Sequence, residues 1–146
     1  MKSMANSPVA HLTRRYEFSA SHRLHSNAMP EEENQRIYGK CNNPYGHGHN
    51  YHLEVTVAGP IDPTTGMVMN IVDLDAIVRT EVLVHFDHTN LNLDLACFRD
   101  TVPTSENLLL EIAGRLRHTI PGLVKLKLQE TGKNFFEYRI PMSDNK

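Results

Sequence analysis

Segments in which hydrophobic and polar residues alternate lie toward both ends of the chain, and two segments with helical spacing lie between them. Residues 9–22 (VAHLTRRYEFSASH) are rich in strand-forming residues and polar at alternate positions, which predicts a strand. Residues 49–59 (HNYHLEVTVAG) alternate more clearly and predict a second strand with one apolar face. The apolar positions of that face are Tyr51, Leu53, Val55 and Val57.

The spacing of apolar residues changes to a helical period in residues 69–86 and again in residues 103–118. Asp73 is the predicted N-cap of the first helix, and Thr104 is the predicted N-cap of the second. The recurring apolar residues are Leu74, Ile77, Val78 and Val84 in the first helix and Leu108, Leu109, Ile112 and Leu116 in the second.

Alternation returns in residues 123–131 (LVKLKLQET) and 135–140 (FFEYRI), which the turn GKN joins into an antiparallel pair. The order is therefore β-β-α-α-β-β, which predicts an α+β fold: an antiparallel sheet with two helices on one face. Little in the sequence protects the outer strands with proline or inward-pointing charge, so we expect edge-to-edge assembly into an oligomer.

Composition narrows the class of protein. The 146 residues predict a single domain over residues 1–146, with about residues 1–8 as a loose tail. A net charge of −2 argues against nucleic acid as the main partner, because phosphate binding normally needs a basic excess. No apolar run approaches the roughly 18–20 residues of a membrane span, and no secretory signal is recognisable. Two cysteines make no disulfide framework, which favours a reduced, cytoplasmic setting.

A group of histidines predicts a metal site. His47 and His49 flank Gly48 at the start of the second strand, where residues i and i+2 face the same side. His22 ends the first strand, which as a hairpin neighbour would bring a third imidazole beside them. Three protein ligands with one open position are typical of catalytic zinc. Polar residues exposed at the start of a strand would explain the pattern equally simply.

Cys41 lies six residues before His47, in a loop of Asn, Pro and Gly residues. It could be a fourth ligand, which would close the site and make the zinc structural. It could equally lie beside the metal, where a cation lowers the pKa of the thiol and makes a thiolate base. The spacing does not separate these two interpretations.

A second polar group follows the first predicted helix. Asp87 and His88 could be an orienting carboxylate and a proton-transferring imidazole, or simply a helix C-terminus with a turn residue. Glu130 shares the apolar face of the third strand, where a carboxylate is either paired or functional. Glu106 is a helix-start residue that could also reach the mouth of the sheet.

Six segments, in this order and spacing, resemble the 6-pyruvoyltetrahydropterin synthase family: FSASHRL, YGKCNNPYGHGHNY, GMVMNIVDL, DHTNLN, PTSEN and LQET. The resemblance spans nearly the whole chain, from about residue 14 to residue 138. It implies the tunnelling fold, in which the sheets of three subunits join into a barrel and two trimers form a homohexamer. It also implies a small-molecule substrate, 7,8-dihydroneopterin triphosphate, and the products 6-pyruvoyl-5,6,7,8-tetrahydropterin and triphosphate, in tetrahydrobiopterin biosynthesis.

The resemblance also implies roles for individual residues. One Zn²⁺ per subunit would be held by the three histidines, Cys41 would be the general base, and Glu130 would anchor the pterin ring. Asp87 and His88 would complete a proton relay from a neighbouring subunit. The further substrate-binding residues implied are Glu106, Thr104 and Ser105, and Ser105 stands where a second threonine is common in the family.

Two other functions stay open at this level. The first is 6-carboxytetrahydropterin synthase of queuosine biosynthesis, which has the same fold, metal and substrate, although its cysteine is typically closer to the His-Gly-His segment. The second is a non-catalytic zinc protein in which Cys41 closes the site. Mg²⁺ could accompany the triphosphate. The basic residues that could receive the triphosphate are Lys40, Arg14, Arg15, Arg23 and Lys133.

Overall fold

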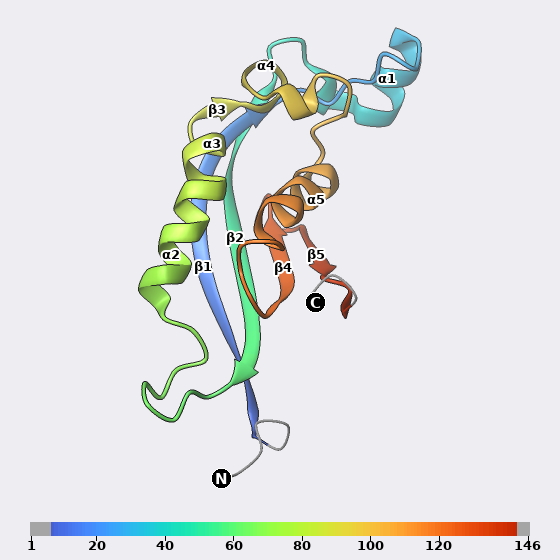
Figure 1. Cartoon of the computed structure of the whole chain (residues 1–146). Helices are drawn as coiled ribbons and strands as arrows, with labels where there is room; N and C mark the ends of the chain where they lie inside the picture. Colours follow the sequence, from blue (N-terminus) through green and yellow to red (C-terminus); the bar gives the residue numbers. More distant parts are fainter. Residues whose placement is uncertain (1–6, 143–146) are drawn as a thin grey trace.

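The computed structural model describes residues 7–142, and its centre is a five-stranded sheet with the strand order β3-β1-β2-β4-β5 (Figure 1). The four predicted strands are confirmed, and neighbouring pairs among them are antiparallel. The fifth strand, β3, was not predicted and runs parallel to β1. The strands are β1 (Val9–His22), β2 (His47–Pro60), β3 (Thr89–Asn90), β4 (Leu123–Gln129) and β5 (Phe135–Arg139).

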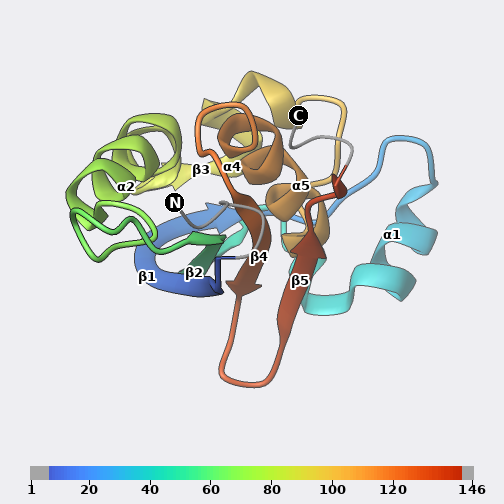
Figure 2. The same ribbon diagram turned by 60° about the horizontal axis from the view of Figure 1, so that its bottom comes forward.

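The principal helices cover one face of the sheet, as the α+β prediction requires (Figure 2). α2 (Ile71–Val78) continues through a π-helical turn (Arg79–Leu83) into α3 (Val84–Phe86), and α5 (Ser105–Leu116) lies over β4 and β5. Two short helices were not predicted. α1 (Glu31–Tyr38) lies in the connection between β1 and β2, away from the sheet, and α4 (Leu91–Asp94) follows β3.

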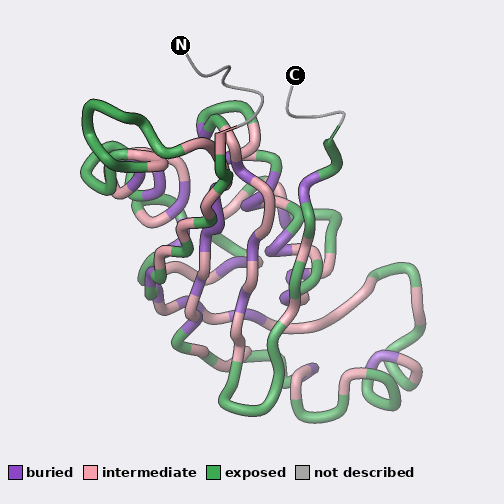
Figure 3. Tube along the Cα trace, turned by 90° about the horizontal axis from the view of Figure 1, so that it is seen from below, coloured by how far each residue is buried: buried purple, intermediate pink, exposed green. Residues whose placement is uncertain are grey.

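The hydrophobic core lies between these helices and the covered face of the sheet. The four apolar residues predicted for β2 are buried, and buried and more exposed positions alternate along the strands (Figure 3). Phe18 stacks on Tyr51 with ring centroids 5.1 Å apart, which joins β1 and β2 in the core. The opposite face is polar: Glu54 pairs with Lys127, and Thr13 hydrogen-bonds Thr56.

Two details of the first helix differ from the prediction. Asn70, not Asp73, is the N-cap, because its side chain accepts a hydrogen bond from the backbone N–H of Val72 at 2.9 Å. Val84 is 63% exposed, whereas Phe86 is fully buried. The π-helical turn explains the shift, since its wider turn keeps residues spaced by four on one face beyond Val78. The helix therefore buries Leu74, Val78, Val82 and Phe86.

The second principal helix begins as predicted. The Thr104 hydroxyl accepts a hydrogen bond from the N–H of Asn107, and the four predicted apolar residues are all buried. Over residues 7–142, no helix combines the length and the hydropathy that a membrane crossing needs. The predicted N-terminal tail lies for the most part outside the described residues, and β1 begins at Val9.

Candidate functional site

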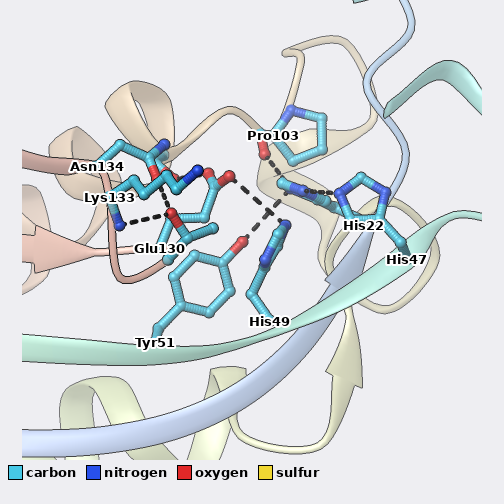
Figure 4. Close-up of polar contacts among 10 residues, drawn as sticks. His22, His47, His49, Tyr51, Pro103, Glu130, Lys133 and Asn134 are labelled. Carbon is cyan, nitrogen blue, oxygen red and sulfur yellow. Dashed lines mark hydrogen bonds and ion pairs between the residues drawn. The ribbon is translucent and has the colours of Figure 1, made fainter. Parts of the chain in front are cut away.

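Three histidine side chains meet where β1 ends and β2 begins (Figure 4). His22 lies opposite His47 in the antiparallel ladder, and Ala20 lies opposite His49, so strand pairing sets the register of the group. One ring nitrogen from each histidine lies within 4.8 Å of the other two. The prediction that His22 would join the His-Gly-His segment across a strand pair is therefore correct in geometry.

The positions of the nitrogens suit a tetrahedral metal. The Nε2 atoms of His22 and His47 are 3.3 Å apart. Two ligands at about 2.0–2.1 Å from one tetrahedral zinc ion would be roughly 3.3–3.4 Å apart. The Nε2 atom of His49 is buried without a hydrogen-bond partner within the described part of the chain. Because a buried polar atom normally has a partner, this nitrogen also indicates a ligand position.

The backbone fixes the orientation of the His22 ring. Its Nδ1 lies 2.8 Å from the carbonyl oxygen of Pro103, which can only accept a hydrogen bond, so Nδ1 carries the proton. Nε2 is then the unprotonated atom and is directed toward His47. Metal-binding histidines usually have such a partner on the second ring nitrogen. The Tyr51 hydroxyl lies 3.4 Å from the same Nδ1.

Gly46 allows the chain to approach His22 closely before β2 starts. Its φ of 73° is in the left-handed region, and a Cβ built there would lie 2.8 Å from the backbone oxygen of His22. A larger residue would therefore push His47 away from His22. This glycine was noted only as part of a turn, yet it is what permits the approach of these two ligands.

Burial lowers the pKa of the His22 and His49 imidazoles below their ordinary value of 6.5. The imidazoles of His47 and His49 lower the pKa of His22 further. The imidazole of His47 likewise lowers the pKa of His49 further. Neutral imidazole is the form that binds a metal. Both side chains are therefore ready to coordinate at neutral pH.

The lowered pKa values predict how the metal-free protein responds to acid. Below pH 6.5 the unfolded chain binds protons at these two positions more readily than the folded chain does. The free energy of unfolding is therefore expected to decrease as the pH falls through 6.5 toward the lower folded-state values. Urea unfolding of the metal-free protein between pH 7.5 and 5 measures this effect. His49→Gln, which does not titrate, should reduce the dependence, and an unchanged pH dependence in that variant would contradict the prediction.

Glu130 follows β4 directly and turns its carboxylate toward the histidines, as its predicted place on the apolar face requires. One carboxylate oxygen lies 3.5 Å from Nε2 of His49, which is an ion-pair distance too long for a good hydrogen bond. The other accepts a hydrogen bond from the hydroxyl of Ser105. The carboxylate is half-buried, and each of its oxygens has a further lone pair, so it can still accept hydrogen bonds from a ligand.

Cys41 lies in a 3₁₀ turn (Gly39–Asn42) that is hydrogen-bonded to the chain just beyond His22. The backbone N–H of Leu24 donates to the carbonyl of Cys41 at 2.9 Å, and the buried Asn42 amide donates to the carbonyl of Leu24 and to Nδ1 of His25. The sulfur is not in the cluster of ligand atoms that the histidines form. The cluster therefore offers three ligand atoms within the described residues, and Cys41 does not supply a fourth.

The protein alone does not make Cys41 a thiolate. Burial raises the pKa of the thiol, and the negative charge of Glu130 raises it further. A cation close by would have to lower the pKa before this thiol could act as a base near neutral pH. The expectation of a reactive thiolate therefore depends on a metal ion.

Asp87 and His88 lie on the outer edge of β1. The carboxylate of Asp87 is 3.0 Å from Nδ1 of His88, so the two adjacent side chains do pair. The backbone of His88, at φ 61°, donates to the carbonyl of Ser19, and the N–H of Ser19 donates to Asp87 at 2.9 Å. The hydrogen bond from Ser19 is the largest cause of the lowered pKa of Asp87.

His88 is highly exposed, with 83% of its side chain accessible. It lines a hollow of about 470 Å³ together with His49 and Gly48. Within residues 7–142, neither Asp87 nor His88 contacts Cys41 or Glu130. The pair is thus held on Ser19, apart from Cys41 and Glu130, with the His88 side chain open to solvent.

The remaining predicted residues have different environments. Ser105 is buried against Glu130, and Thr104 caps α5, whereas Glu106 is exposed and makes no contact with the histidines or Glu130 among the described residues. The prediction missed Tyr51, although its position two residues after His49 places it on the same face. It also missed the Pro103 carbonyl, which no sequence pattern would indicate.

Comparison with known proteins gives a consistent result. The family model described as 6-pyruvoyl tetrahydropterin synthase matches residues 11–141. The chain is 46% identical to the 6-pyruvoyl tetrahydrobiopterin synthase of Poecilia reticulata over 143 residues, covering 94% of this chain and 97% of that protein. It is 47% identical to the Homo sapiens protein of the same name over 132 residues, covering 89% and 91%.

A solved structure agrees as well. The Caenorhabditis elegans 6-pyruvoyl tetrahydropterin synthase is 40% identical, with a TM-score of 0.88, and the match covers 92% of this chain and 98% of that one. The similarity thus extends over nearly the whole chain.

Proposed function

This chain belongs to the 6-pyruvoyl tetrahydropterin synthase family and is a lyase of that family, and we propose that it converts 7,8-dihydroneopterin triphosphate into 6-pyruvoyl-5,6,7,8-tetrahydropterin and triphosphate. The observation that carries the proposal is the placement of Glu130 beside a cluster of three imidazoles that could hold a metal ion. The oxidation of the side chain and the reduction of the ring take place within the same substrate molecule. The ring gains the two hydrogens that the three-carbon side chain loses, so no external redox cofactor is needed.

Glu130 is the proposed anchor of the pterin ring. The pyrimidine edge of a pterin presents adjacent N–H donors, and a carboxylate can accept two such hydrogen bonds at once. Ser105 already donates to this carboxylate and would hold it in place. Thr104 caps α5 and so stabilises the start of the helix that carries Ser105. Glu106 stays a weaker candidate because its side chain is exposed.

Zn²⁺ is the proposed metal, held by His22, His47 and His49 with one position left for substrate. A bound zinc ion would polarise the oxygens of the substrate side chain as a Lewis acid. The hydrogen bond from His22 to Pro103 keeps the nitrogen that faces the metal unprotonated. Cys41 would remove protons from the hydroxyl-bearing carbons, and its fixed main chain beside Leu24 would hold the thiol in position.

Asp87 and His88 are proposed to act in the site of a neighbouring subunit, where the imidazole would exchange protons and the carboxylate would orient it. The exposure of His88 supports this assignment, as does the absence of a contact with Cys41 over residues 7–142. The arrangement requires the predicted homohexamer, a dimer of trimers with sheets joined into a barrel. β5 and the short β3 form the two edges of this sheet.

The remaining features of the proposal concern the whole chain. It would function as a single domain over residues 1–146, and the family match to residues 11–141 is consistent with one unit. Two unpaired cysteines are compatible with a cytoplasmic enzyme. Mg²⁺ could bind with the triphosphate of the substrate.

The decisive experiment is identification of the product. Zinc-loaded protein incubated without oxygen with 7,8-dihydroneopterin triphosphate is expected to give a tetrahydropterin that keeps all three side-chain carbons, with one triphosphate released per turnover. Mass spectrometry measures both. A Glu130→Gln variant, which loses the negative charge, should raise KM and decrease kcat/KM by about 10- to 100-fold, as expected for a charge-assisted hydrogen bond.

Other outcomes would assign a different function. A 6-carboxypterin together with acetaldehyde would identify the related carboxy enzyme. Failure of the zinc-loaded hexamer to turn over this substrate would contradict the proposal and favour a structural zinc site.

A further inference from the structure

We propose that the cavity beside His47, between residues 23–28, 44–46 and 90–103, is the binding subsite for the triphosphate of the substrate. This inference rests on the proposed function and adds the location and the residues of phosphate binding. The cavity has a volume of about 440 Å³. Arg23 and Gly46, which line it, are the chain neighbours of the metal-binding residues His22 and His47.

The order of residues along β2 gives the direction of the substrate. Gln129 pairs with His52, so Glu130 lies level with Tyr51, and His49, His47 and Gly46 follow in that order. Figure 4 shows the same succession, with His49 and His22 between Glu130 and His47. In a pterin, the side chain on C6 is on the opposite end of the ring system from the pyrimidine edge. A ring anchored at Glu130 therefore directs its triphosphate past the histidines toward the cavity.

Arg23 lines the cavity and has guanidinium nitrogens that are available to an anion. Its Nε donates to the carbonyl of Asn42 at 3.0 Å, and its backbone is fixed by two hydrogen bonds with the side chain of Asn92. The two terminal nitrogens of the guanidinium have no partner among residues 7–142. A planar fork held at one nitrogen and free at the other two is suited to bidentate binding of phosphate.

Further donors lie on the other walls. Arg99 is exposed, and no contact engages its guanidinium over the described residues. The Asn42 amide donates to Nδ1 of His25, so the neutral His25 ring carries its proton on Nε2 and can donate to a ligand. Asp100 is the one acidic residue in the lining, so the cationic residues exceed it.

The wall formed by residues 26–28 is held in place by a buried amide. Asn34, which is fully buried, accepts a hydrogen bond from the N–H of Ser26 and donates to the carbonyls of Ser26, Met29 and Pro30. Asn34 of α1 thereby fixes the loop of residues 26–28, which lines the cavity together with Arg99. The cavity is thus preformed, and less ordering is required when an anion binds.

The test compares two ligands that differ only in the phosphates. Neopterin triphosphate and neopterin, which are oxidised and do not react, are titrated by calorimetry into the zinc-loaded full chain. The Kd for neopterin divided by the Kd for neopterin triphosphate measures the contribution of the triphosphate to binding. Arg99→Ala is expected to decrease this ratio about tenfold and to leave the Kd for neopterin unchanged, since one charge-assisted contact is lost.

Two further variants make the result specific. Arg23→Lys keeps the positive charge but loses the paired N–H donors of the guanidinium, and it should also decrease the ratio several-fold. Arg79→Ala removes one exposed positive charge outside the cavity, on the helix that follows α2, and should leave the ratio unchanged. An unchanged ratio in both cavity variants would overturn the proposal, as would an equal decrease in Arg79→Ala. Because the product of the wild-type reaction is measured separately, either result would leave the proposed function standing.

Discussion

Replacement of His47 by alanine is expected to weaken zinc binding by at least about 100-fold and to abolish turnover. Loss of a residue that only hydrogen-bonds a metal ligand typically decreases metal affinity by about 10- to 100-fold, and loss of a ligand removes a direct bond to the metal. His47 is the suitable position because it is only half-buried, whereas His22 is fully buried and its replacement would also leave a cavity in the protein. The fold should therefore persist in the His47→Ala variant.

Competition with a chelating dye measures the zinc affinity, and thermal unfolding provides a second measurement. A ligand that binds only the folded state stabilises it in proportion to the logarithm of its concentration over Kd. Zinc should therefore raise the Tm of the wild type and have little effect on the variant. The matched control is His52→Ala, on the same strand but paired with Glu17 on the opposite face of the sheet. Wild-type zinc affinity in the His47→Ala variant would exclude this cluster as the metal site.

The sequence contained enough information to predict this cluster, because strand geometry has a simple period. Alternation places His47 and His49 on one side of β2, and an antiparallel neighbour that ends in His22 completes the group. The same reasoning correctly placed Glu130, directly after β4, on the side of the buried residues of that strand. Local patterns were sufficient here because each residue lies within or next to a regular strand.

Features that depend on distant contacts were not predictable in this way. α1 has a low apolar content and is held by one buried residue, Asn34, whose partners are backbone groups. His22 is oriented by donating a hydrogen bond to the carbonyl of Pro103, 81 residues away, and a carbonyl has no sequence signature. The π-helical turn brings Phe86 to the core in place of the predicted Val84, and no rule of residue spacing indicates where such a turn occurs. Tertiary packing therefore determines the parts of the site that local sequence propensity does not predict.

Replacement of Cys41 by alanine is expected to decrease kcat by about 10²- to 10⁴-fold, the usual contribution of a positioned general base. Zinc should remain at about one equivalent per chain, because the sulfur is separate from the cluster of ligand nitrogens. The turn that carries Cys41 is fixed by the Leu24 and Asn42 hydrogen bonds, which do not involve the thiol. The fold and the affinity for neopterin should therefore be maintained.

The pH dependence of the wild type tests the chemistry behind this result. Burial and the Glu130 charge hold the pKa of the Cys41 thiol above its ordinary value in the metal-free chain. If the thiolate is the base, kcat/KM of the zinc-loaded enzyme rises with pH up to the pKa of the thiol. This rising limb of the pH profile should lie near neutral pH, because the zinc charge lowers that pKa. The limb should be absent from the residual activity of Cys41→Ala and unchanged in Cys97→Ala, the control at the second free cysteine. Loss of zinc from Cys41→Ala would instead identify Cys41 as a fourth ligand, and retention of full activity would exclude the thiol as the base.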